Sequence, residues 1–214
     1  SFGITENQFF PHTESEWNAK GIWTGSRDAH LTDKGFQDAR LLGELITDIH
    51  IGHAYASLQV RTMETLSSML GTMRQPTVSI TRDRVLNERD YGEYTGKNKH
   101  DMKEILGEEM FEKVRRGWDV AIPQGETLKM VNERVVPYYL SEILPRVKNG
   151  ENVLVVSHGN ALRALIKYIE SLSDEAIENT EMMFGGVVMY TINEEGKSLS
   201  KEERKTPSVS YDHV

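Results

Sequence analysis

The fold of this chain is decided by the stretch Asn152-Val153-Leu154-Val155-Val156-Ser157-His158-Gly159-Asn160. Its apolar run contains no alternating polar residues, which is typical of a parallel strand that is buried on both faces. The run stops at His158, and residues 161–169 then follow a helical spacing of apolar residues. A buried strand that leads directly into a helix predicts an α/β fold.

The remaining periodicities extend this pattern along the chain. Further strands are predicted at residues 4–10, 54–56, 78–80 and 187–192, and further helices at 33–46, 61–73, 99–106, 108–114 and 128–147. Thr32 and Thr127 are predicted helix caps, Leu140 is expected on the apolar side of the 128–147 helix, and Pro137 is expected to kink that helix. We therefore predict a three-layer α/β fold: a mostly parallel central sheet with helices on both faces.

No internal repeat or flexible linker divides the sequence, so residues 1–214 are predicted to form one domain. From about residue 194 the chain becomes polar and charged. This segment is predicted to be a mobile C-terminal tail.

Composition excludes several classes of function. The chain has no cysteine, so disulfides, thiolate metal sites and a cysteine nucleophile are excluded. Its formal net charge of −8 argues against nucleic acid as a partner. No apolar run approaches the roughly 20 residues that a membrane span needs, and no signal segment opens the chain, so we expect a cytoplasmic enzyme with no membrane partner. Any bound anion must therefore be held by a local cluster of basic groups.

Polar residues that can support catalysis fall at the predicted strand ends. His12 and His158 each end a strand, Ser57 leads from another strand to Arg61, and Glu88 follows a third strand. In open α/β sheets, ligands bind beyond the carboxyl ends of the strands. A neutral imidazole can act as a nucleophile or a base near neutral pH. The two histidines therefore indicate a catalytic site at this edge.

A series of motifs, in order along the chain, resembles a known family. It comprises residues 12–18 (HTESEWN), 24–25 (TG), 31–35 (LTDKG), 57–61 (SLQVR), 86–92 (LNERDYG), 96–99 (GKNK), 115–116 (RR), 125–128 (GETL) and 157–165 (SHGNALRAL). The series resembles the histidine phosphatase superfamily and, within it, the cofactor-dependent phosphoglycerate mutases. The resemblance implies the fold described above. It also implies interconversion of 3-phosphoglycerate and 2-phosphoglycerate through a phosphohistidine that 2,3-bisphosphoglycerate primes.

The resemblance also assigns roles to individual residues. It implies that His12 is the nucleophile, Glu88 the general acid/base, and that His158 and Arg61 stabilise charge on the transferring phosphoryl group. The substrate, a small anionic phosphoglycerate, would be bound by Ser15, Asn18, Thr24, Gly25, Tyr91, Lys99, Arg115, Arg116 and Asn160. No metal is implied as a cofactor. A homo-oligomer, either a dimer or a tetramer, is left open.

One part of the site departs from the family pattern. Members ordinarily carry Arg-His-Gly at the nucleophile, where this chain has Pro11-His12-Thr13. The missing arginine removes one charge-assisted donor, and such a loss costs about 100-fold in rate. Pro11 also removes an amide hydrogen from a strand. Three readings follow: a working mutase, an impaired relative that binds ligand or regulates, and a phosphomonoesterase of the same fold.

Overall fold

The computed structural model describes residues 6–182 and 185–206, and these residues share one six-stranded sheet. The strand order is β3-β2-β4-β1-β5-β6. The first four in this order pair in parallel, and β5 and β6 add antiparallel pairs at one side. The strands are β1 Glu6–Pro11, β2 His53–Ala56, β3 Ile80–Arg82, β4 Val153–Ser157, β5 Gly186–Ile192 and β6 Ser198–Lys205.

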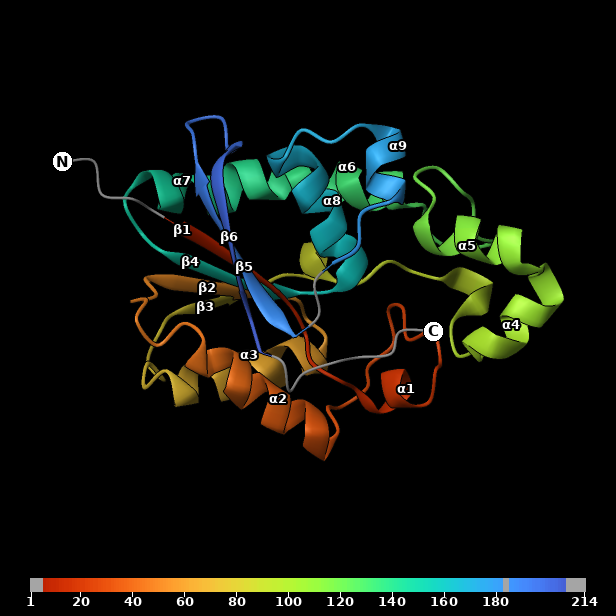
Figure 1. Cartoon of the computed structure of the whole chain (residues 1–214), viewed down its shortest axis with the longest axis horizontal. Helices are drawn as coiled ribbons and strands as arrows, with labels where there is room; N and C mark the ends of the chain where they lie inside the picture. The colour runs from red at the N-terminus through yellow and green to blue at the C-terminus, as the bar shows by residue number, and fades with distance from the viewer. Residues whose placement is uncertain (1–5, 183–184, 207–214) are drawn as a thin grey trace.

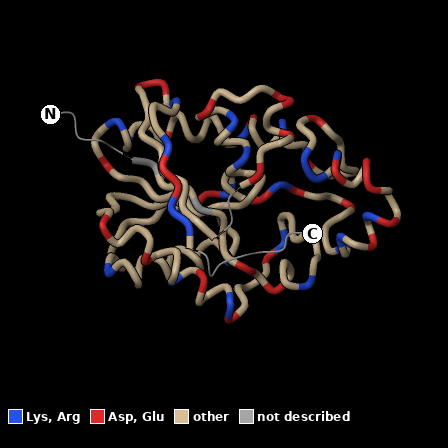
Figure 2. The backbone as a smooth tube through the Cα atoms, in the orientation of Figure 1, with Lys and Arg blue, Asp and Glu red and all other residues tan. Residues whose placement is uncertain are grey.

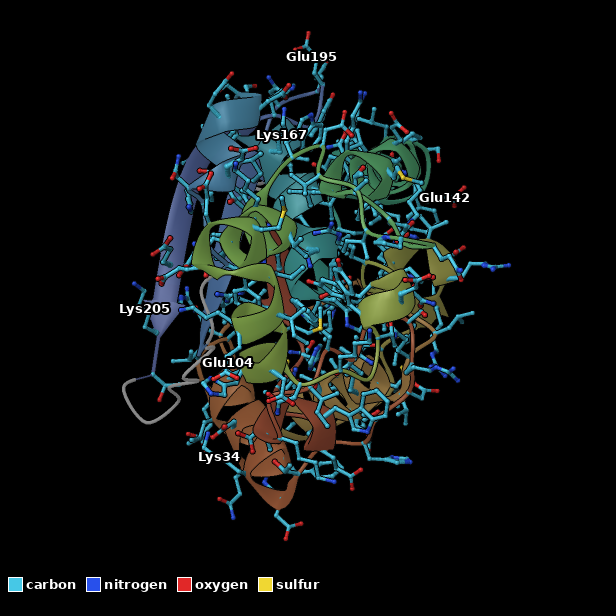
Figure 3. The ribbon with its side chains drawn as sticks, turned by 90° about the vertical axis from the view of Figure 1, so that its right-hand side faces the viewer. Lys34, Glu104, Glu142, Lys167, Glu195 and Lys205 are labelled. Carbon is cyan, nitrogen blue, oxygen red and sulfur yellow. The ribbon has the colours of Figure 1, made fainter. Side chains whose placement is uncertain are left out.

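Helices cover both faces of this sheet, so the predicted three-layer architecture is confirmed (Figure 1). One face carries α2 Asp33–Glu44 and α3 Val60–Thr72, and the other carries α6 Leu128–Tyr138, α7 Leu144–Lys148 and α8 Gly159–Ile169. Seen from one end of the molecule, Lys34 of α2 and Lys167 of α8 mark these opposite layers (Figure 3). The shorter helices are α1 Glu16–Ala19, α4 Lys99–Leu106, α5 Glu108–Arg116 and α9 Asp174–Glu178.

The core follows from the alternation of side chains along the strands. In β4, Val153 and Val155 pack with α6 and α8, whereas Leu154 and Val156 pack with α2 and α3. β4 lies between β2 and β1, so both of its edges are paired, and the helices of the two layers cover its faces. All of its residues are buried, as the unbroken apolar run predicted.

A third, smaller apolar cluster holds α4 and α5 beside the sheet. Trp23 stacks on Tyr91 and on Tyr94, with ring centroids 5.3 and 5.7 Å apart, and also contacts Phe111 of α5. These helices project from the end of the sheet at which β1 and β4 finish (Figure 1). Figure 3 looks onto this end, where Glu104 marks α4. The two helices, split by Gly107 as predicted, are therefore positioned to form a wall of a site at that end.

Three predicted elements need correction, and two of them are strands of the sheet in the structure. The third strand covers residues 80–82 instead of 78–80, because a turn at Pro76 and Thr77 delays its start. The polar segment from residue 194 contains β6, which pairs along β5, so the prediction of a mobile tail is wrong for residues 198–205, while its part at 207–214 lies outside the described residues. Arg204 of β6 further anchors the strand by donating to Leu45 O at 2.9 Å and to Asp48 Oδ1 at 2.6 Å.

The helix predicted at 128–147 is interrupted after Pro137. Proline has no amide hydrogen to donate within a helix, and the turn that follows, Tyr139–Ile143, is π-helical. The wider turn changes which residues face the core. Tyr139 and Ile143 are fully buried and Leu140 is 37% exposed, so the prediction that Leu140 packs inward is wrong.

Gln8 is an unusual residue in the centre of the sheet. It pairs with Leu154 of β4 and Met189 of β5, on the face that packs against α2 and α3. Gln8 is 0% exposed, and neither atom of its amide group has a hydrogen-bond partner within the described residues. A buried amide without partners costs free energy.

We expect Gln8→Leu to raise the free energy of unfolding by about 1 kcal/mol, because the substitution removes the buried amide and adds apolar packing. Denaturant titration measures the change. The matched control is Gln75→Leu, since the Gln75 amide accepts from Ile51 N and donates to Ile49 O, both at 2.8 Å. The control should be destabilised. A Gln8→Leu protein less stable than wild type would show that the buried amide does not destabilise the fold.

No helix in the described ranges is long and apolar enough to cross a membrane.

Candidate active site

A pocket of about 500 Å³ lies at the carboxyl ends of β1 and β4, at the edge of the sheet where the sequence predicted a site. Most of the predicted site residues line it, and they come from segments far apart in the chain. These are His12, Asn18, Glu88, Tyr91, Lys99, Arg115, Arg116 and Asn160. The structure therefore brings eight of the predicted side chains together in one cavity, whereas the predicted catalytic residues Arg61 and His158 are buried beside it and are not among those that line it.

His12 is held in a single ring orientation at the end of β1. Its Nδ1 lies 2.6 Å from Thr13 O. A carbonyl oxygen can only accept, so Nδ1 carries the hydrogen, and in the neutral ring Nε2 carries the lone pair. Arg61 Nε donates to this Nε2 at 3.2 Å. His12 is thus the tautomer in which Nε2 can act as a nucleophile.

His158 lies directly behind His12. The register pairs Pro11 with Ser157, and the His12 amide donates to Ser157 O at 2.9 Å, so the two histidine rings meet edge to face with centroids 5.0 Å apart. His158 is fully buried, and its Nε2 is 2.8 Å from Ser57 Oγ. Burial lowers the pKa of His158 well below its usual value, and the charge of Arg61 lowers it further. His158 is therefore neutral at pH 7.

Arg61 is almost completely buried in the first turn of α3. Its Nη1 donates to Arg27 O at 2.8 Å and its Nη2 to Gly25 O at 3.1 Å. Burial lowers the pKa of Arg61 to about 10, while the negative charges of Glu88 and Asp28 oppose the shift. The guanidinium thus stays charged at neutral pH. Its fork of hydrogen bonds fixes it against His12.

Glu88 reaches the pocket on a loop that other side chains hold in place. Its amide donates to Gln59 Oε1 at 2.8 Å, and its carbonyl accepts from Arg134 Nη2 at 3.2 Å. The Gln59 amide also donates to Gly25 O and Arg27 O, the carbonyls that Arg61 contacts. Gln59 therefore fixes Glu88 and Arg61 relative to each other. Sequence reasoning did not single it out, although it stands inside the motif at 57–61.

Lys99, Arg115 and Arg116 line the same pocket as His12 and form its basic wall. Glu112 of α5 accepts from Arg115 Nη1 at 3.2 Å and from Arg116 Nε at 3.0 Å, at the helical spacings of three and four residues. Lys99 has no hydrogen bond or ion pair to another side chain in the described part of the chain. Burial lowers the pKa of Lys99 to about 8, and the charge of Arg115 contributes. The wall is therefore cationic and only partly neutralised.

Tyr91 and Asn160 link this wall to the first turn of α8. Asn160 Nδ2 donates to Tyr91 Oη at 2.8 Å, and Asn160 Oδ1 accepts from Arg163 Nη1 at 3.2 Å. Burial raises the pKa of Tyr91, so its phenol is neutral. Gly159 and Asn160 line the pocket where α8 begins, and no side chain caps that end of the helix. The helix N-terminus therefore favours an anion in the pocket.

Arg163 is a pocket residue that sequence reasoning did not assign. It donates to Ile177 O at 2.7 Å, to Thr180 O at 3.0 Å and to Arg116 O at 3.1 Å. Arg163 thus ties α5 and the segment after α9 to α8. Its position in the motif at 157–165 was the available signal.

Three predicted binding residues are not among those that line the pocket. Ser15 caps α1, where its hydroxyl donates to Asn18 Oδ1 at 2.7 Å. Gly25 contributes its carbonyl to Arg61 and Gln59, with a positive φ of 53°. Thr24 is buried beside it. These residues support the walls of the pocket.

The structure accommodates both unusual neighbours of His12. Along β1 the amide of His12 bonds to β4, so by alternation the nitrogen of Pro11 faces the β5 side, where the register ends at Phe9. The missing amide hydrogen of Pro11 therefore falls beyond the last residue of β1 that pairs with β5. The Thr13 hydroxyl donates to Gly35 O at 2.7 Å, and its amide donates to Thr65 Oγ1 at 3.1 Å. Thr13 anchors the loop to α2 and α3.

No group of acidic and histidine side chains suited to a metal ion occurs within the described ranges.

Comparison with known proteins identifies the family of the chain. The model of the histidine phosphatase superfamily (branch 1) matches residues 9–204. A 2,3-bisphosphoglycerate-dependent phosphoglycerate mutase of Parvibaculum lavamentivorans is 41% identical over 193 residues, which cover 89% of this chain and 92% of that protein.

Two solved structures show the same fold. A phosphoglycerate mutase from Bacillus anthracis superposes with a TM-score of 0.75 at 22% identity, covering 95% of this chain and 93% of that one. The alpha-ribazole phosphatase from Shigella flexneri also has a TM-score of 0.75 at 22% identity, covering 92% and 95%. The fold is therefore shared equally by a mutase and a phosphatase. It does not by itself decide between these activities.

The buried, neutral His158 predicts a dependence of stability on pH. Because its folded pKa is depressed, the unfolded state binds more protons below about pH 6.5, and stability falls as pH drops below that value. We expect His158 to contribute up to about 1.4 kcal/mol per pH unit to this fall. Urea unfolding between pH 7 and pH 5 measures it. His158→Gln should show a shallower fall than wild type, and an equal fall in both proteins would contradict a neutral His158.

Proposed function

The chain belongs to the histidine phosphatase superfamily, and we propose that it interconverts 3-phosphoglycerate and 2-phosphoglycerate through a phosphohistidine primed by 2,3-bisphosphoglycerate. The observation that carries the proposal is the orientation of His12. Its Nδ1 donates to Thr13 O, and its Nε2 lies beside Arg61 in a pocket that Lys99, Arg115 and Arg116 also line. The sequence-based expectation of a cytoplasmic enzyme is part of the same proposal.

His12 acts as the nucleophile in this proposal. Its Nε2 forms a bond to phosphorus while the bond from phosphorus to the donor oxygen breaks, and the phosphoryl group later leaves in the reverse sense. Nδ1 keeps its hydrogen and donates it to Thr13 O, and this hydrogen bond stabilises the positive charge that develops on the ring. Two transfers through the enzyme thus replace one direct transfer between two substrate hydroxyls.

Glu88 acts as the general acid/base. It lines the pocket, and its carboxylate accepts from the Arg89 amide at 2.7 Å, which fixes its direction. In one transfer it protonates the leaving oxygen, and in the next it removes the proton from the attacking hydroxyl. The bonds from Gln59 and Arg134 keep the loop that carries Glu88 in place during both transfers.

The charge on the transferring phosphoryl oxygens is balanced by Arg61, His158 and the start of α8. Arg61 is charged at neutral pH and rigidly held, so little reorganisation is needed when charge develops. The neutral His158 can donate one hydrogen bond but adds no charge of its own.

The donor set fits 2,3-bisphosphoglycerate, which carries two phosphates and a carboxylate. His12, Arg61 and the amides at the start of α8 would hold one phosphate, and Lys99, Arg115 and Arg116 would hold the remaining anionic groups. When bound, this cofactor supplies the phosphoryl group that primes His12. The two ends of the pocket thus provide separate cationic regions for a doubly phosphorylated ligand.

The phosphatase and ligand-binding readings differ from the mutase reading in the fate of a phosphoenzyme. A phosphomonoesterase passes the phosphoryl group to water, and a binding protein does not form the phosphoenzyme. The basic wall supports the mutase, because it can hold a phosphoglycerate against phosphorylated His12 while transfer occurs.

We expect a mass increase of one phosphoryl group when the protein is incubated with 2,3-bisphosphoglycerate, followed by conversion of 3-phosphoglycerate to 2-phosphoglycerate. Intact-mass spectrometry detects the first event, and ³¹P NMR of the products detects the second. His12→Ala should abolish both, because it removes the nucleophile. Glu88→Gln should still bind ligand but turn over at least about 100-fold more slowly.

Each other outcome supports a different reading. Label that is lost to water without forming 2-phosphoglycerate would indicate a phosphomonoesterase. Ligand binding without label or turnover would indicate a binding protein. Full activity of His12→Ala would refute the assignment of the nucleophile.

The lowered pKa of Lys99 predicts that substrate binding weakens at alkaline pH. Its pKa of about 8 means that it loses its charge as pH rises above that value, which weakens the attraction for an anionic phosphoglycerate. We expect kcat/KM to fall above about pH 8. Lys99→Arg, whose charge persists, should shift this fall to higher pH. A profile that is the same in both proteins would contradict the role of Lys99.

A further inference from the structure

An acidic side chain stands on the basic wall of the pocket. Glu181, in the segment between α9 and β5, lines the cavity, and its carboxylate accepts from Arg116 Nη2. In the fold, α9 packs beside α8 on the side that faces α5 (Figure 1). Neither the motif series nor the proposed chemistry assigns a role to Glu181.

The other carboxylates in the pocket have different partners. Glu14 Oε1 accepts from the Thr32 hydroxyl at 2.8 Å, and Glu88 Oε1 accepts from the Arg89 amide. Glu181 instead contacts a cation that faces the ligand. Arg116 is also paired with Glu112 on its own helix, so its guanidinium remains oriented when Glu181 moves away.

We infer that the Glu181 carboxylate competes with anionic ligands for Arg116. An incoming ligand displaces this carboxylate from Arg116, and Glu181 thereby sets the affinity of the pocket for phosphoglycerates. The inference rests on the proposed binding of the substrate by the basic wall. It adds a residue that determines affinity and specificity without taking part in phosphoryl transfer.

Exposure indicates that displacement costs little. The Glu181 side chain is 65% exposed and that of Arg116 is 33% exposed, so their ion pair is well solvated and weak. A phosphate or carboxylate with several acceptor oxygens can replace one exposed carboxylate at this position.

Only the Glu181 side chain has to move when a ligand displaces it from Arg116. Arg163 holds the backbone on both sides of the turn after α9, through Ile177 O at 2.7 Å and Thr180 O at 3.0 Å. The backbone before Glu181 is therefore anchored, and the Glu181 side chain can turn toward solvent while the wall keeps its shape. The competition is thus local to Arg116.

Neutralising Glu181 tests this inference on the full chain. We expect Glu181→Gln to bind 3-phosphoglycerate about five-fold more tightly than wild type in calorimetric titration at low salt, since an exposed ion pair no longer competes. The gain should shrink at about 1 M salt, where exposed charges are screened. In the mutase assay KM should fall and kcat should stay unchanged.

Glu175→Gln is the matched control. Glu175 is an exposed residue of α9 that is not among the residues lining the pocket, and the substitution changes the net charge equally. Its affinity should equal that of wild type. The second comparison is the Arg116→Gln background, in which Glu181→Gln should bring no further gain.

Several results would overturn the inference: affinity in Glu181→Gln that is equal to or weaker than wild type, an equal gain in Glu175→Gln, or the full gain persisting without Arg116. Binding detectable only in Glu181→Gln would support it, and binding in neither protein would overturn it. The titration measures binding and needs no turnover. If the protein binds 3-phosphoglycerate but does not catalyse its conversion, the proposed mutase activity is refuted, while the measured effect of Glu181→Gln on affinity still stands.

Discussion

The parallel pairing of β1 with β4 is the constraint on which the site depends. Its register places Pro11 opposite Ser157, and the two histidines that follow these residues leave the sheet side by side. A shift of one residue in either strand would turn one imidazole to the opposite face. The unbroken apolar sequence of β4, buried on both faces, and the β1–β5 pairing on the far side keep this register in place.

The two buried groups beside His12 differ in charge. The chain has a formal net charge of −8, and basic and acidic residues are interspersed along the whole backbone (Figure 2). Cationic side chains nevertheless gather at one pocket: Glu112 orients Arg115 and Arg116, which line it, and two backbone carbonyls orient Arg61, which donates to His12. Burial keeps His158 neutral, whereas Arg61 stays charged at neutral pH. A phosphoryl group beside His12 would thus meet one fixed cation and a neutral histidine.

The sequence predicted those parts of the fold and site that depend on local pattern. The apolar run of β4, the capped helix after Thr32 and the strand-end positions of His12 and His158 all follow from short-range periodicity. β6 escaped prediction because its residues are almost all polar and its strand exists through pairing with β5. Leu140 was misplaced because a π-helical turn shifts the register of a helix. Gln59, Arg163 and Glu181 act through contacts between distant segments, and periodicity carries no information about such contacts.

Thr13 O holds the Nδ1 hydrogen of His12, and for this reason we expect phosphorus to bond to Nε2. Long-range ¹H–¹⁵N correlation spectra of the ¹⁵N-labelled protein, recorded after incubation with 2,3-bisphosphoglycerate, identify which histidine nitrogen carries the phosphoryl group. We predict that it is Nε2 of His12, with a retained Nδ1 hydrogen. Phosphorus on Nδ1 of His12, or on either nitrogen of His158, would contradict the proposed role of this hydrogen bond.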